Sequence, residues 1–396
     1  MILTGVPVKP PIRPSRNHAL DGLRGLAAIA VLLGHVVVAT SVVQASQYLG
    51  DPQPLTAGAW LFAETPLVGV WAGQEWVVVF FVLSGFVLSL AAAGGARFDA
   101  ARYYPARLVR LYVPVWAALI FAAVVHEAIA HDRIAGASAW LNLHATDWSA
   151  TTTAHEIVLL AQAGDPYYTT VLWSLRWEVA FSLLLPVFLL CASRFPLRLL
   201  AALALAAIIA GGPGSGVLRY MPVFMLGTAL AFGREQVAAA LVKRRVYAPA
   251  LVASPILLTA THWMPGGLWQ HAAYGLGAVG ASGLVATAMV PGPFAAWLQT
   301  RPMQFVGRRS FSLYLVHEPI VVAAAFALGG MPSAPVLLAC AALPVAAATI
   351  AFYHCVELPA QTLARGAGRR SAELAHAGDD HGVAPHARAA SEGAAT

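Results

Sequence analysis

The stretch Leu20-Asp-Gly-Leu-Arg-Gly-Leu-Ala-Ala-Ile-Ala-Val-Leu-Leu-Gly-His35 opens an apolar run that continues to about residue 43. A bilayer-spanning helix needs roughly 20 apolar residues, so this run is long enough to cross a membrane. Arg24 and His35 lie inside it, eleven positions apart. In a helix they share one face and are separated by about 16 Å along the axis. Because ionisable residues inside a span are costly and mark functional sites, we predict that Arg24 binds an anion and His35 accepts a proton.

The composition of the whole chain indicates a membrane protein. Of its 396 residues, 59% are hydrophobic and only 11% are charged, whereas soluble domains carry about 25% charged residues. The polar, proline-rich and basic segment Met1–Asn17 does not have the pattern of a signal peptide. The net charge of +6 is expected to lie in cytoplasmic loops, so no nucleic-acid partner is predicted.

Ten apolar segments follow one another along the chain. They are 19–42, 75–94, 107–126, 172–192, 196–211, 217–233, 247–263, 271–290, 305–328 and 335–356. The sequence thus predicts an all-α, polytopic membrane protein of about ten transmembrane helices. With an even number of spans, both termini lie on one side. If that side is the cytoplasm, nearly all arginines and lysines fall in inner loops, as the positive-inside rule requires.

The same segmentation predicts the domain organisation. Residues 1–18 form a cytoplasmic N-terminal segment, 19–358 a membrane domain, and 359–396 a cytoplasmic tail that is expected to be mostly disordered. Two outer loops are long, 43–74 and 127–171. The tryptophans and tyrosines of the second loop suit either an interfacial belt or a sugar-stacking surface.

Six motifs in order give the chain a resemblance to the acyltransferase-3 family of integral membrane acyltransferases, which includes bacterial O-antigen and exopolysaccharide O-acetyltransferases. They are Leu20-Asp-Gly-Leu-Arg24 through His35, Phe80-Phe-Val-Leu-Ser-Gly-Phe86, Arg107-Leu-Val-Arg-Leu-Tyr-Val-Pro114, Trp173-Ser-Leu-Arg-Trp-Glu178, Tyr314-Leu-Val-His-Glu-Pro319 and Tyr353-His-Cys-Val-Glu-Leu-Pro359. The chain resembles the stand-alone form of the family. It departs from the family pattern at Val78, Arg176, Trp177 and Val179, which bears on the acceptor.

The resemblance implies transfer of an acyl group, usually acetyl from acetyl-CoA, to a hydroxyl. This chemistry needs a base at the attacking oxygen, a positive site for the CoA phosphates, and donors for the oxyanion. His35 is the expected catalytic base, because a neutral imidazole accepts a proton. Arg24, Arg107 and Arg110 are expected to bind CoA, since arginine forks suit phosphates. For Arg107 and Arg110, positive-inside topology is an equal alternative.

The remaining candidate site residues each have a structural alternative. Glu178 is the second expected catalytic residue, either orienting His35 or binding acceptor hydroxyls; its alternative is a salt bridge to Arg176 or Arg219. The expected substrate contacts are Ser84, Trp173, Tyr314 and His317. For Ser84, close helix packing beside Gly85 is the alternative, and for His317 it is a polar network around Pro319. No metal site and no tightly bound cofactor are expected.

We therefore expect a multi-pass inner-membrane O-acyltransferase. Its partners are acyl-CoA, most simply acetyl-CoA, a sugar hydroxyl of a cell-surface glycan or of its lipid-linked precursor, and the lipid bilayer. His35 acts as a base in direct transfer, with an acyl-His35 intermediate as the mechanistic alternative. A transporter or flippase, and a catalytically silent sensor of the same fold, are the alternative functions.

Overall fold

The computed structural model describes residues 17–40, 57–145, 150–159, 168–243 and 245–381. Within these ranges the regular structure is entirely helical, which confirms the predicted all-α fold. The helices are α1 (His18–Ala39), α3 (Ala57–Ala63), η1 (Pro66–Val70), α4 (Gly73–Ala93), α5 (Ala100–Ala128), α6 (Ala139–Asn142), α7 (Ala150–Ile157), α8 (Leu172–Arg194), α9 (Leu197–Gly211), α10 (Gly216–Phe232), α11 (Arg234–Lys243), α12 (Tyr247–Leu258), α13 (Ala260–Trp263), α14 (Leu268–Met289), α15 (Pro293–Leu298), α16 (Arg301–Arg308), α17 (Ser310–Ala327), α18 (Ala334–Phe352), the π-helical turn η2 (Tyr353–Glu357) and α19 (Leu358–His381).

The helix lengths define a multi-pass membrane protein. Within the described residues, seven helices are long and apolar enough to cross a bilayer, or eight if α10 and α11, bent by 75° at their junction, form one span. Each of the ten predicted segments overlaps a helix over its described residues, but 247–263 is divided between α12 and α13, and 305–328 between α16 and α17. The predicted count of ten additionally requires α9 and α12 to cross, and these have only 15 and 12 residues.

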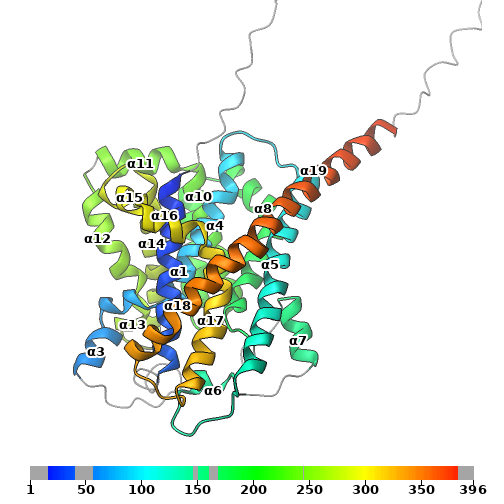
Figure 1. The fold of residues 1–396 in the computed structure, drawn as a ribbon. Coiled ribbons are helices and arrows are strands. Elements are labelled where there is room, and N and C mark those ends of the chain that lie inside the picture. Colours follow the sequence, from blue (N-terminus) through cyan, green and yellow to red (C-terminus); the bar gives the residue numbers. More distant parts are fainter. Residues whose placement is uncertain (1–16, 41–56, 146–149, 160–167, 244, 382–396) are drawn as a thin grey trace, which may run out of the picture.

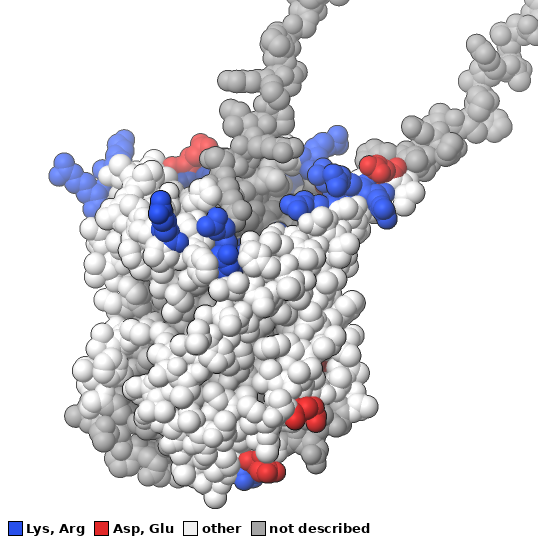
Figure 2. All heavy atoms as spheres, viewed as in Figure 1, with Lys and Arg blue, Asp and Glu red and all other residues white. Residues whose placement is uncertain are grey.

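Positive charge gathers at one end of the bundle. Figure 2 shows arginine and lysine side chains at this end, above a band of the visible face that is mainly uncharged. We call it the basic end; it carries α11 and α16 with their residues Arg234, Lys243, Arg301 and Arg308 (Figure 1). The start of α1 lies here as well, because Gln304 of α16 donates to the His18 carbonyl at 2.6 Å.

Helix α1 occupies the middle of the bundle and contacts α4, α14, α16 and α17 (Figure 1). It begins where the Asn17 side chain accepts a hydrogen bond from the amide of Ala19, as an N-cap residue does. Its apolar residues, among them Leu23, Ala27 and Val31, are buried. Because other helices surround α1, its polar residues face the protein interior and not lipid. This is the environment that the sequence predicted for Arg24 and His35.

Helices α4 and α10 cross at a backbone-to-backbone contact. A Cβ atom at Gly85 would collide with the carbonyl of Phe224, and one at Gly227 would collide with the carbonyl of Val82. Small residues permit such close crossings in membrane bundles. The crossing expected near Gly85 is therefore present, and it fixes the position of the neighbouring Ser84.

The C-terminal part of the chain differs from the expectation of a mostly disordered tail over 359–396. After the π-helical turn η2 the helix continues as α19, which runs to His381 and projects beyond the body of the bundle (Figure 1). Over its first half α19 packs along α5, and Gly368 lets its backbone approach that of Arg102. Tertiary packing thus stabilises a segment whose own sequence has no clear apolar period.

The α4–α10 crossing yields a stability prediction. Gly85→Ala is expected to lower the free energy of unfolding by about 1–3 kcal/mol, because the added methyl group overpacks a backbone contact. The midpoint of thermal unfolding in detergent, at a fixed scan rate, measures the effect. Gly366→Ala on α19 is the matched control, since a Cβ there meets open space; equal midpoints for the two variants would contradict the assigned crossing.

Candidate active site

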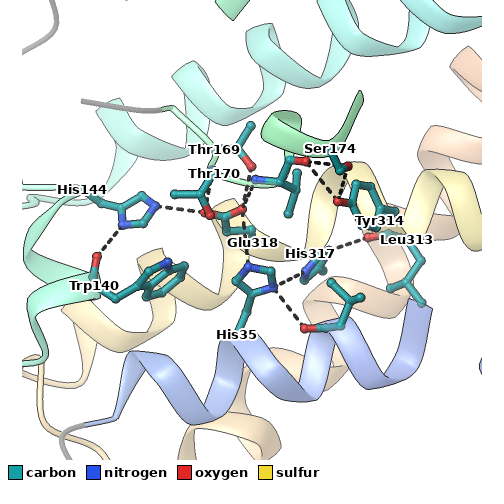
Figure 3. A network of polar contacts seen from close by, with 12 residues as sticks. His35, Trp140, His144, Thr169, Thr170, Ser174, Leu313, Tyr314, His317 and Glu318 are labelled. Atoms are coloured by element: carbon teal, nitrogen blue, oxygen red, sulfur yellow. Dashed lines mark hydrogen bonds and ion pairs between the residues drawn. The ribbon is translucent and has the colours of Figure 1, made fainter. Parts of the chain in front are cut away.

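Four ionisable side chains meet near the end of α1 that is remote from the basic end. His35 of α1, His317 and Glu318 of α17, and His144, which follows α6, form a cluster that we call the histidine–glutamate cluster (Figure 3). The ring of Trp140 lies against His35 with 5.4 Å between the ring centroids. Three segments far apart in the sequence thus build one polar site inside an apolar bundle.

Glu318 is the organising residue of this cluster. Its carboxylate is fully buried and accepts five hydrogen bonds of 2.7–3.0 Å, from the Thr169 hydroxyl, the amide and hydroxyl of Thr170, the amide of Val171, and Nε2 of His144. Two of these donors are amides just before α8, so the carboxylate also caps that helix, where its negative charge is favoured by the helix dipole. Five donors at one buried site stabilise the ionised form of Glu318.

The hydrogen bonds of His317 decide which nitrogen of His35 carries a proton. Nδ1 of His317 lies 2.9 Å from the Leu313 carbonyl, which can only accept, so this nitrogen donates. Nε2 of a neutral His317 is then an acceptor, and it lies 3.0 Å from Nδ1 of His35. His35 Nδ1 also lies 3.0 Å from the carbonyl of Val31. Both partners therefore place the proton of neutral His35 on Nδ1 and leave Nε2 with its lone pair.

The free nitrogen of His35 is placed for proton transfer. Nε2 lies 4.0 Å from Oε2 of Glu318, and 18% of the His35 side chain is exposed. When Nε2 takes a proton, the resulting imidazolium faces a buried carboxylate and is stabilised by it. An oriented imidazole beside a carboxylate is an arrangement that can act as a general base.

A cavity of about 140 Å³ lies between the basic end and this cluster. It is lined by arginines of α1 and α5, by carboxylates of α8 and η2, and by small or aromatic residues of α4 and α17. The polar and charged lining residues are Arg24, Ser84, Arg107, Arg110, Ser174, Glu178, Ser310, Tyr314 and Glu357. The structure thus brings together Arg24, Arg107 and Arg110, the three residues predicted to bind CoA.

Glu178 lies in this cavity and not in the histidine–glutamate cluster. Its carboxylate pairs with Arg107 and accepts a hydrogen bond from Ser84 at 2.8 Å. The structure places Glu318, and not Glu178, beside His35. Glu178 does form a salt bridge, as the structural alternative predicted, but its partner is Arg107 and not Arg176 or Arg219.

Glu357 joins α17 to the turn η2 at the same cavity. Its buried carboxylate accepts hydrogen bonds from the amide and hydroxyl of Ser312 and from Gln361. The π-helical turn directs this side chain into the bundle, as insertions of this kind frequently do at functional sites.

Tyr314 and Ser174 separate the cavity from His35. Their hydroxyls are 2.7 Å apart, and Tyr314 also donates to the Val171 carbonyl at 3.0 Å. Both residues line the cavity and His35 does not. Trp173 is directed elsewhere, because its ring packs against Phe81 and Tyr220.

A second cavity, of about 430 Å³, opens at the basic end and shares Leu88, Arg107 and Arg110 with the first. We call it the mouth cavity; its other charged lining residues are Arg97, Asp99, Arg102 and Arg365. The two cavities together hold six arginines against three carboxylates. A net positive and concave surface of this size fits an anionic small molecule.

The sequence analysis named Glu178 as a carboxylate that orients His35 and did not consider Glu318 for this role. Glu318 stands directly after the candidate His317 in one of the quoted motifs, and its position beside an ionisable residue inside a span was the available signal. His144, Thr169 and Thr170 carry no such signal, since they come from the long outer loop and reach Glu318 only through the fold.

Comparison with known proteins identifies the family. The model of the acyltransferase-3 family, described as an acyltransferase domain, matches residues 17–354. The chain therefore belongs to this family, and it is a multi-pass membrane acyltransferase. Membership favours the acyltransferase prediction over a transporter or flippase. Searches of the curated proteins and of the solved structures returned no match.

The role of Glu318 in the fold yields a second prediction. Glu318→Gln is expected to lower the free energy of unfolding by about 2 kcal/mol. The NH2 group of the glutamine would face groups that now donate hydrogen bonds to the carboxylate, so some of these bonds are lost. The shift in the thermal midpoint in detergent measures this loss. Glu235→Gln, whose side chain is 83% exposed, is expected to leave the midpoint unchanged; an unchanged midpoint for Glu318→Gln would show that the cluster is not organised around this carboxylate.

Proposed function

We propose that the protein is an inner-membrane O-acetyltransferase that moves the acetyl group of cytoplasmic acetyl-CoA to a hydroxyl of a cell-surface glycan or of its lipid-linked precursor. In this proposal the basic end faces the cytoplasm, as the positive-inside rule requires. The histidine–glutamate cluster then lies towards the outer side of the membrane.

One observation supports the proposal above the others. A single helix, α1, presents Arg24 to an arginine-lined cavity on the side of the basic end and His35 to a buried carboxylate on the other side. An anion site and a base on one helix face supply the two functions that transfer from an acyl-CoA requires.

The arginine-lined cavity suits the donor. Guanidinium groups bind phosphates through paired hydrogen bonds, and Arg24, Arg107 and Arg110 line the same space. The separation of Arg24 and His35 along α1, about 16 Å, is comparable with an extended pantetheine arm. Phosphates held near the arginines therefore bring the thioester towards Tyr314 and Ser174.

His35 performs the proton transfer in this mechanism. The acceptor oxygen attacks the thioester carbon while its proton passes to Nε2 of His35. The carbon–oxygen bond forms and the carbon–sulfur bond breaks, and the departing thiolate takes the proton from Nε2 of His35, which gives free CoA and returns the imidazole to its neutral form. Glu318 stabilises the imidazolium between these steps. The hydroxyl of Ser174, which loses its Tyr314 partner when the phenol turns aside, is a donor for the oxyanion.

Tyr314 controls access in the proposed reaction. Because Tyr314 and Ser174 stand between the cavity and His35, the thioester reaches the base only when the Tyr314 side chain turns aside. Hydrogen bonds to Ser174 and Val171 hold the phenol hydroxyl, and such bonds contribute about 1 kcal/mol each. The buried ring also packs against Phe80, so turning it aside costs this packing as well. A closed Tyr314 keeps the thioester away from water until the acceptor is bound.

Trp140 packs beside the base and is not a free stacking surface. Its indole ring contacts both His35 and His144, and only 8% of the residue is exposed. The sugar acceptor of this proposal therefore rests on the resemblance to glycan O-acetyltransferases.

His35 provides the direct test of the mechanism. His35→Gln is expected to reduce acetyl transfer at least about a hundredfold, since a general base contributes two to four orders of magnitude. Transfer from radiolabelled acetyl-CoA in native membranes measures the rate, and the amount of folded protein is compared by gel filtration in detergent. His354→Gln is the matched control, because His354 is exposed on η2. Normal transfer by folded His35→Gln would contradict the assignment.

The acceptor is tested in cells of the source organism. Deleting the coding sequence is expected to remove acetyl groups from a surface glycan, and expression of the wild type restores them, whereas His35→Gln does not. Mass spectrometry of the isolated glycans reports the loss as the mass of one acetyl group per modified sugar. Identical glycan masses in the deletion strain and its parent would exclude the proposed acceptor.

A further inference from the structure

The C-terminal helix forms one wall of the mouth cavity. Gln361, Ala364 and Arg365 of α19 line this space, opposite the end of α4 and the first turns of α5. The family match ends at residue 354, so these residues lie beyond it. The contact of Gly368 with the backbone of Arg102 holds α19 against α5, and Gln361 links α19 to Glu357 of the inner cavity.

The side chains that meet in the mouth cavity have a particular chemistry. Arg365 of α19 shares the lining with Arg97 and Arg102, while Asp99 is the one carboxylate among its described lining residues. The Asp99 side chain caps the start of α5 by accepting from the amide of Arg102. The aromatic pair Phe98 and Tyr103, with ring centroids 5.1 Å apart, lines the same cavity. Cations beside aromatic rings are the elements that bind a phosphorylated nucleoside.

The two cavities adjoin each other, one behind the other. Arg107 and Arg110 belong to both, so they mark the junction, and the residues of α19 lie only on the side of the mouth. An acyl-CoA has its thioester at one end and its 3′-phosphoadenosine at the other, with the diphosphate between them. If the thioester lies towards Tyr314 and the diphosphate at the junction, the nucleoside end lies in the mouth cavity.

We propose that Arg365 of α19, together with Arg97 and Arg102, binds the 3′-phosphate of the acyl-CoA donor, and that α19 is thereby a part of the donor site. This inference rests on the proposed function. It assigns to the C-terminal helix a role in selecting 3′-phosphorylated donors over thioesters that lack this group.

A comparison of two donors tests the inference. The donor KM is measured in native membranes with radiolabelled acetyl-CoA and with acetyl-3′-dephospho-CoA, for the wild type, Arg365→Gln and Arg370→Gln. Arg370→Gln is the matched control, since Arg370 is exposed on the same helix and does not line the mouth cavity. We expect Arg365→Gln to raise the KM for acetyl-CoA about tenfold, the effect of losing one charged contact, and to leave the KM for the dephospho donor unchanged.

The possible results separate the two proposals. An unchanged KM of Arg365→Gln for acetyl-CoA, or an equal rise for both donors, overturns the assignment of Arg365 while leaving the acetyl-CoA-dependent activity of the wild type intact. A wild type that transfers acetyl from neither donor overturns the proposed function and this inference together. Arg365 is exposed, so its replacement does not disturb the core, and gel filtration of each variant in detergent verifies this.

Discussion

The candidate active site depends on the hydrogen bonds that the buried carboxylate of Glu318 accepts. An isolated charge inside an apolar bundle is strongly unfavourable, and it persists only when its hydrogen-bonding capacity is satisfied. Here the donors come from the segment before α8 and from His144. The need to satisfy one charge therefore brings α17, α8 and the outer loop together, and it places a negative group opposite His35.

The arginines and the imidazole–carboxylate pair lie at different levels along α1. Arginines are concentrated on the side of the basic end, where they line the mouth cavity and the inner cavity. The imidazole–carboxylate pair lies deeper, where burial strengthens the electrostatic interaction between them. The arginine–glutamate pair formed by Arg107 and Glu178 lies between the two, and it lowers the cost of keeping an arginine in an apolar region.

The fold was largely predictable from the sequence, and the site only in part. Long apolar runs define spans directly, and Arg24 together with the arginine pair of α5 could be grouped because all three lie near the basic ends of their helices. The sequence analysis named Glu178 and missed Glu318 as the carboxylate beside His35, because that position depends on how α8 and α17 are rotated about their axes. The first half of α19 packs along α5, and this tertiary contact is not encoded in the local sequence.

The glycine contacts of the bundle have a consequence for how substrates move through it. At Gly85 and Gly227, α4 and α10 touch through their backbones, and α1 meets α16 in the same way at Gly25 and Gly307. Helices locked at such points resist tilting or sliding as rigid bodies. A rocking motion that exposes the centre alternately to the two sides of the membrane would have to break these contacts. These contacts therefore favour entry to the centre by rotation of single side chains over rigid-body movement of whole helices.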